Sequence, residues 1–204
     1  MLHNFAVDLA HAFYAGKEHT NDDIEIYAYG LEVFLATAIQ LVALFTLAFI
    51  FGQTLATIAF LIGFTPLRLE AGGYHARTHL GCFCRFTLLY ISFLIILQTL
   101  PVNLYSWMAI ALVGCSFIPV LTLAPLPDEN RPVGPKRLKI SRRRSLKRFF
   151  ICSTVIIVFS VVNLLGEGFL QQIFFALSFG QFAVALLLIA AKIRNTYKFR
   201  RAQT

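Results

Sequence analysis

The chain has 204 residues, of which 58% are hydrophobic and 14% charged, and its formal net charge is +8. Soluble domains carry about 25% charged residues, so this composition excludes an ordinary water-soluble domain and favours a membrane protein. On a soluble protein the positive charge would suggest nucleic acid. Here it indicates cytoplasmic loops that attract anionic lipid headgroups, and no nucleic-acid partner is expected.

Residues 1–30 are predicted to form an interfacial amphipathic region. Leu2, Phe5 and Leu9 share one helical face, an arrangement typical of a helix that lies on a membrane surface. Residues 20–23 then supply capping and acidic first-turn side chains, which indicate that the next helix begins within them.

Six apolar segments are predicted to cross the membrane or to dip into it, at residues 33–51, 54–67, 86–100, 104–124, 149–165 and 169–191. The second and third are shorter than the roughly 20 residues that span a bilayer, so they either extend into their polar flanks or turn back. Cys115 and Cys152 fall inside these runs and are expected to be buried thiols. The predicted fold is all-α, a single polytopic membrane domain with about six transmembrane or re-entrant helices and an N-terminal amphipathic helix.

The Lys and Arg residues are distributed very unevenly. All 18 fall at Lys17 or within residues 68–85, 131–148 and 192–201, and the connections near residues 52–53, 101–103 and 166–168 have none. An excess of positive charge marks cytoplasmic loops. We therefore expect both termini, residues 68–85 and the basic loop 125–148 on the cytoplasmic side, whether the chain crosses the membrane six times or four.

Residues 68–85 form the one predicted membrane boundary at which histidines, cysteines, glycines and arginines gather. A histidine or a cation near a cysteine stabilises the thiolate, which is the nucleophilic form. The candidate pairs combine one base, His75 or His79, with one nucleophile, Cys82 or Cys84. His79 and Cys82 can meet on one helix, whereas His75 would lie about 10 Å from Cys82 along a straight helix, so the backbone between them would have to bend.

One spacing in this stretch is specific. The chain reads Arg68, three residues, Gly72-Gly73, one residue, His75, six residues, Cys82. With the length and hydropathy of the chain, this pattern resembles the accessory gene regulator protein B (AgrB) family of bacterial membrane proteins. The resemblance implies that Cys82 is the nucleophile and His75 its general base. It also implies that Arg68 and Gly73 occupy positions needed for activity, with Gly72 as a further supporting residue.

The same resemblance implies the reaction and the partners. Members of this family are cysteine endopeptidases of quorum sensing, which cut the C-terminal tail from a small membrane-associated propeptide. The cysteine holds the body of the propeptide as a thioester until an internal thiol or hydroxyl attacks, and the product is a cyclic thiolactone or lactone. We therefore expect a propeptide substrate, contact with membrane lipids, a homodimer and no cofactor, in a bacterial cell membrane.

Two groups of charged residues have alternative interpretations. Glu70 is either a carboxylate that pairs with Arg68 or a third catalytic group that orients His75. A basic run is a contact either for lipid headgroups or for an acidic peptide tail. It comprises Arg142, Arg143 and Arg144.

A metal site is a further alternative for the histidines. His75 and His79 have the spacing of two zinc ligands on one helical face, with Cys82 as a third. Ala76 stands where a zinc peptidase would carry its general-base Glu, so no metal is expected.

A small membrane transporter or a non-enzymatic assembly factor is the alternative class of protein. Proton- or ion-coupled transport needs ionisable residues within the spans, and the six predicted spans contain essentially none. Their neutral polar side chains are expected to hold helices together. These are Gln40, Gln98, Asn163 and Gln181.

Overall fold

A computed structural model describes residues 2–14, 21–72, 79–126, 134–165 and 170–201. Within these ranges the chain is helical and contains no β-strand. The elements are α1 (Leu2–Tyr14), α2 (Asn21–Ile50), α3 (Thr54–Ala71), α4 (His79–Thr99), the 3-10 helix η1 (Val102–Leu104), α5 (Tyr105–Leu123), α6 (Pro135–Leu165) and α7 (Gln171–Arg201).

The prediction of an all-α membrane fold is confirmed, because the structure has 6 helices long and apolar enough to cross a membrane, α2 to α7. The two short apolar segments extend into their polar flanks, so that α3 has 18 residues and α4 has 21. Both lengths are close to the roughly 20 residues that a bilayer requires. Helix α1 precedes the bundle and packs on the start of α2, where Val7 contacts the pair Ile24 and Ala28.

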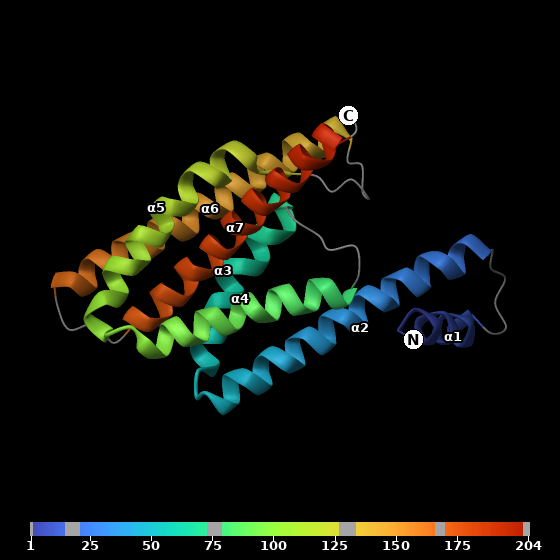
Figure 1. Cartoon of the computed structure of the whole chain (residues 1–204), viewed down its shortest axis with the longest axis horizontal. Helices are drawn as coiled ribbons and strands as arrows, with labels where there is room; N and C mark the ends of the chain where they lie inside the picture. The colour runs from blue at the N-terminus through green and yellow to red at the C-terminus, as the bar shows by residue number, and fades with distance from the viewer. Residues whose placement is uncertain (1, 15–20, 73–78, 127–133, 166–169, 202–204) are drawn as a thin grey trace.

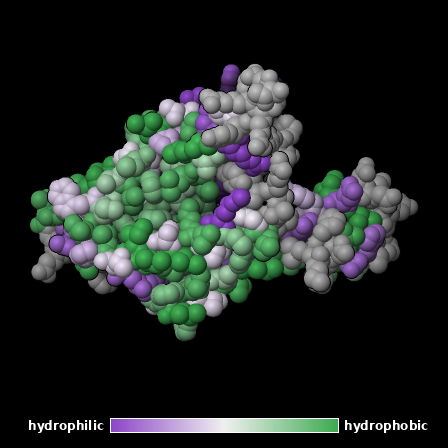
Figure 2. Space-filling view, viewed as in Figure 1, coloured by the Kyte–Doolittle hydropathy of each residue, from purple (hydrophilic) through white to green (hydrophobic). Residues whose placement is uncertain are grey.

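Helix α7 is the centre of the bundle. It packs against α3, α5 and α6 and also contacts α4, while α2 contacts α3 and α4 at the edge of the bundle (Figure 1). Within the most apolar stretch of each helix, 61% of the residues of α7 are buried, against 11% in α2. Figure 2 shows hydrophobic side chains over most of the visible surface of the bundle. Such a surface suits lipid better than water.

Among the described helices, α3 and α7 have the most extensive contact, and it depends on two glycines. A Cβ atom at Gly63 would overlap the carbonyl of Leu177, and one at Gly180 would overlap the carbonyl of Phe60. Small residues that let backbones approach closely are typical of helix pairs in membranes. Around this crossing the fully buried Phe60 and Phe93 stack with ring centroids 5.0 Å apart, which connects α4 to the same core.

Neutral polar side chains join helices as expected in two of four cases. Gln40 on α2 donates to Thr87 on α4 at 3.1 Å. Gln181 on α7 accepts a hydrogen bond from Ser153 on α6 at 3.2 Å. Of the other two, Gln98 lines a pocket, and the buried side-chain nitrogen of Asn163 has no hydrogen-bond partner among the described residues.

The two cysteines of the apolar runs differ in burial. Cys152 is half-buried and packs against a small core cluster, whereas Cys115 is exposed on α5. The expectation of a buried thiol was therefore wrong for Cys115. An apolar run alone cannot distinguish a side chain that faces lipid from one that faces another helix, because both surroundings are apolar.

The described Lys and Arg residues gather at one end of the bundle. This basic end comprises the end of α3, the start of α4, the first half of α6 and the end of α7, toward the right of the six-helix bundle in Figure 1. The opposite end, called the far end, comprises the α2–α3 turn, the α4–α5 turn and the start of α7. Its described residues include no Lys or Arg.

Candidate active site at the basic end of the bundle

The chain leaves α3 through a turn that only glycine fits well. Gly72 has a φ angle of +68°, and its N–H donates to the carbonyl of Arg68 at 3.2 Å. A Cβ atom at this position would overlap the carbonyl of Leu126. Both the positive φ and the close approach require glycine, which explains the first glycine of the Gly-Gly pair.

Two further bonds fix this turn. The guanidinium of Arg68 donates to the carbonyl of Gly72, at the point where the chain leaves the helix. The N–H of Leu126 donates to the carbonyl of Ala71 at 2.9 Å, and Gly72 and Leu126 form an isolated parallel bridge. The segment that follows α5 is thereby attached to the end of α3. Arg68 and Gly72, both predicted as supporting residues, thus meet at one turn.

Glu70 lies on the side of α3 that faces α6. Its carboxylate accepts a hydrogen bond from Ser141 at 3.2 Å and lies 3.5 Å from Arg148 and 3.8 Å from Arg144. Arg148 also donates to the carbonyl of Pro66 at 2.7 Å. The side chain of Glu70 is 14% exposed, whereas the two arginines are 43% and 64% exposed. Sequence reasoning identified neither Ser141 nor Arg148, because nothing in the spacing of the basic stretch distinguishes them from their neighbours.

Helix occupies much of both predicted cytoplasmic stretches. Residues 68–71 belong to α3, residues 79–85 to α4, and residues 135–148 to α6. Arg, Lys and Glu are good helix formers, so a membrane helix can continue beyond the lipid, and proline is well tolerated at a first helical position such as Pro135. The basic run therefore lies on α6. Arg142, Arg143 and Arg144 are all exposed, and Arg144 is the member that faces Glu70.

Cys82 lies in the first turn of α4, which begins at His79. It is a free cysteine with an exposed side chain, as is Cys84 two residues later. The other half of the predicted pair, His75, and also Gly73 lie outside the described residues. Their roles, the distance from His75 to Cys82 and the zinc alternative therefore stay predictions.

The arrangement defines a class of protein. It is a polytopic helical membrane protein with exposed thiols at its basic end, close in sequence to a turn fixed by an arginine and a glycine. The profile of the family Accessory gene regulator B (AgrB) matches residues 7–190, and the chain belongs to this family. The resemblance found in the sequence pattern is therefore confirmed.

Individual relatives are more distant. The chain is 27% identical over 128 residues to the Accessory gene regulator protein B of Staphylococcus epidermidis, which covers 63% of this chain and 64% of the relative. It is 25% identical over 115 residues to a putative AgrB-like protein of Halalkalibacterium halodurans, which covers 56% of each chain. The matches thus span less than two thirds of these relatives. No solved structure gives a significant match.

Proposed function

We propose that the protein is a membrane cysteine endopeptidase of bacterial quorum sensing, which removes the C-terminal tail of a small propeptide and promotes cyclisation of the body. The observation that carries the proposal is the exposed Cys82 in the first turn of α4, at the place that the family pattern gives to the nucleophile. Membership of the AgrB family supports the choice of substrate class. His75 completes the proposed pair.

The first half-reaction transfers the propeptide body to the enzyme. The sulfur of Cys82 attacks the carbonyl carbon of the scissile peptide bond while His75 accepts the thiol proton. The C–N bond then breaks, the proton passes from His75 to the departing amine, and the tail leaves. The body remains bound to Cys82 as a thioester. Backbone N–H groups at the start of α4 are the donors available to the oxyanion.

The second half-reaction closes the ring. A thiol or hydroxyl within the bound body attacks the thioester carbonyl, its proton returns to the sulfur of Cys82, and the thiolactone or lactone is released. A thioester is a better acyl donor than a peptide bond, so the attack by the internal thiol or hydroxyl needs no further cofactor. Water competes for the same carbonyl, and a site at the edge of the lipid helps to exclude it.

Arg68 and Gly72 act on this chemistry through the backbone in our proposal. They fix the turn from which residues 73–78 depart, and His75 lies within that segment. Arg68 is therefore a positioning residue, since its guanidinium is bonded to the carbonyl of Gly72. Glu70 has a comparable role, because its carboxylate joins α3 to α6.

The proposal also covers the orientation of the protein in the membrane, the exposed arginines of α6 and the oligomeric state. The distribution of Lys and Arg favours a cytoplasmic location for the basic end and both termini. The exposed Arg142 and Arg143 remain available to lipid headgroups or to an acidic propeptide tail. A homodimer is also part of the proposal, since only 11% of the most apolar stretch of α2 is buried by the described part of the chain.

Co-expression with the small open reading frame beside the gene, followed by mass spectrometry, tests the proposed function. We expect a released tail and a body that is lighter by one water than the linear fragment, and alkylation of thiols should abolish both. An intact propeptide that persists beside well-expressed protein would contradict the proposal. It would favour the transporter or assembly-factor class, in which alkylation has little effect.

A further inference from the structure

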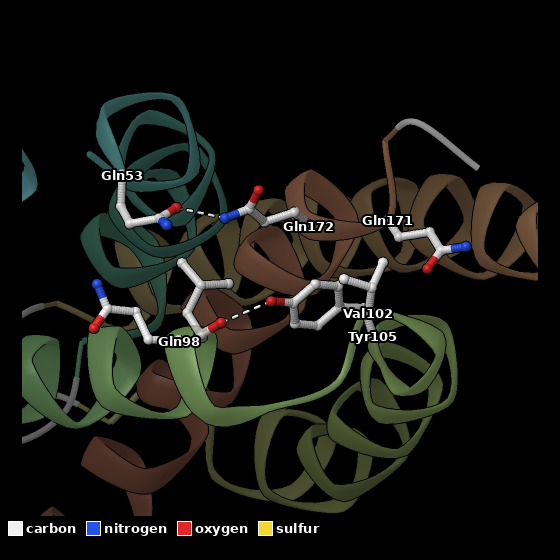
Figure 3. Close-up of a pocket in the computed structure, with 7 residues that line it drawn as sticks. Gln53, Gln98, Val102, Tyr105, Gln171 and Gln172 are labelled. Atoms are coloured by element: carbon white, nitrogen blue, oxygen red, sulfur yellow. Dashed lines mark hydrogen bonds between the residues drawn. The ribbon is translucent and has the colours of Figure 1, made fainter. Parts of the chain in front are cut away.

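A pocket of about 610 Å³ opens at the far end of the bundle, away from Cys82. Four segments contribute to it: the residue that precedes α3, the last turns of α4, η1 with the start of α5, and the start of α7 (Figure 3). Four of the seven glutamines of the chain line it. They are Gln53, Gln98, Gln171 and Gln172.

Among the described residues, the lining of the pocket is polar and carries no charged side chain; Tyr105, Leu97 and Val102 complete it. A pocket without charge is poorly suited to an ion, because a desolvated charge needs an opposite charge as partner. Primary amides both donate and accept hydrogen bonds. The peptide group has the same two functions, so it is the natural complement of an amide-lined pocket.

The hydrogen bonds already present leave some of this capacity unused. Gln172 donates to Gln53 across the pocket, and the hydroxyl of Tyr105 donates to the carbonyl of Leu97 at 2.7 Å (Figure 3). The side-chain oxygen of Gln171 is buried and accepts no hydrogen bond from the described part of the chain. A buried acceptor without a donor is costly, so a rotation of the Gln171 side chain that brought this oxygen to a ligand N–H would be favoured.

We propose that this glutamine pocket, defined by Gln53, Gln98, Gln171 and Gln172, binds a short uncharged peptide segment through its backbone amides. Its volume lies within the roughly 300–1,000 Å³ that is typical of pockets for small ligands. The ligand class agrees with the proposed function, in which a peptide is the substrate and the product. The pocket itself needs no peptidase activity, because it is at the opposite end of the bundle.

Photoaffinity labelling of the full chain in lipid nanodiscs tests this site. The probe is an uncharged pentapeptide with capped ends that carries a diazirine and an alkyne tag, and the labelled residues are located by mass spectrometry. We expect saturable labelling around Val102 and Gln98 that the same peptide without diazirine displaces. Labelling that is not saturable, or that an apolar diazirine compound of equal size reproduces, would overturn the proposal, since it reports partitioning into lipid.

Two substitutions sharpen the test. Gln171→Leu and Gln98→Leu each remove amide hydrogen bonds at similar side-chain volume and should each weaken binding about fivefold. Because the two glutamines lie on different helices, agreement between the variants separates lost binding from local damage. The control is Gln40→Leu, since Gln40 bonds to Thr87 and does not line the pocket. Equal affinity in all three variants and the original chain would overturn the proposal.

The outcome does not depend on the proposed peptidase activity. Cys82→Ala should bind the probe with unchanged affinity, whereas it should not cleave a propeptide. Probe binding without cleavage in the original chain would support the peptide-binding pocket and contradict the proposed peptidase activity. Cleavage without probe binding would support the peptidase activity and contradict the peptide-binding pocket.

Discussion

The carboxylate of Glu70 on α3 lies 3.5 Å from the guanidinium of Arg148 on α6, and the same guanidinium donates to the carbonyl of Pro66. One arginine thus contacts two residues near the end of α3. That end leads through the turn at Gly72 into residues 73–78, where the predicted base His75 lies. The basic helix α6 therefore contacts the end of the helix that precedes the proposed catalytic segment.

Replacement of Arg148 with methionine tests this connection. Since the variant loses a half-exposed ion pair and the hydrogen bond to the carbonyl of Pro66, we expect the free energy of unfolding to fall by about 1–2 kcal/mol. The rate of propeptide cleavage should fall by about tenfold, because small misplacements of a catalytic group are costly. Thermal melting in detergent and a cleavage assay on membranes with matched protein levels measure the two effects.

The matched control for Arg148 is its neighbour Lys147. It is exposed on the same helix, so Lys147→Met removes the same charge away from the contact with Glu70. We expect cleavage to change little in this variant. A similar loss of cleavage in both variants would show that general positive charge matters and that the contact between α3 and α6 does not.

Gly72→Ala should destabilise the protein. The φ angle of +68° and the overlap with the carbonyl of Leu126 leave no space for a Cβ atom without a shift of the backbone. We expect a loss of about 1–3 kcal/mol in the free energy of unfolding, together with reduced cleavage. The control is Gly114→Ala, since a Cβ atom there meets nothing within 4 Å and alanine favours a helix. A melting temperature for Gly72→Ala equal to that of the original chain would contradict the geometry of this turn.

Single cysteines in a cysteine-free background test which side of the membrane the two ends face. The two positions are Lys139, which lies on the exposed basic part of α6, and Val102, which is 64% exposed at the far end. Each is replaced by cysteine in a separate variant. An impermeant maleimide applied to intact cells should label position 102 alone, and position 139 only after the cells are opened. Labelling of position 139 in intact cells would overturn the proposed orientation.

The helices could be predicted from the sequence because each spanning segment is an uninterrupted apolar run, and lipid permits little else at that depth. The ends of α3 and α4 were harder to predict. Arg68 and Arg85 limit the predicted apolar segments, but a helix need not stop where its apolar residues stop, so α3 continues to Ala71 and α4 begins at His79.

Contacts between distant segments could not be predicted in the same way. The sequence pattern selected Arg68 and Gly72, whose shared turn is local. It gave no sign that Glu70 would face Arg148 or that Leu126 would require a glycine at position 72, because these contacts depend on how α3, α5 and α6 pack. The glutamine pocket could not be predicted for the same reason, since its four amides come from segments that only the packing of the bundle brings together.

The central claim is that Cys82 is the nucleophile, and release of the propeptide tail by matched cysteine variants tests it most directly. Cys84→Ala is the control, because both thiols are exposed near the start of α4. We expect Cys82→Ala and His75→Ala to abolish release while the protein still inserts, and Cys84→Ala and His79→Ala to retain most of it. Cys82→Ser should lose nearly all of the rate, since a hydroxyl ionises far less than a thiol. Tail release by Cys82→Ala together with none by Cys84→Ala would contradict the assignment, and normal release by every variant would contradict the peptidase itself.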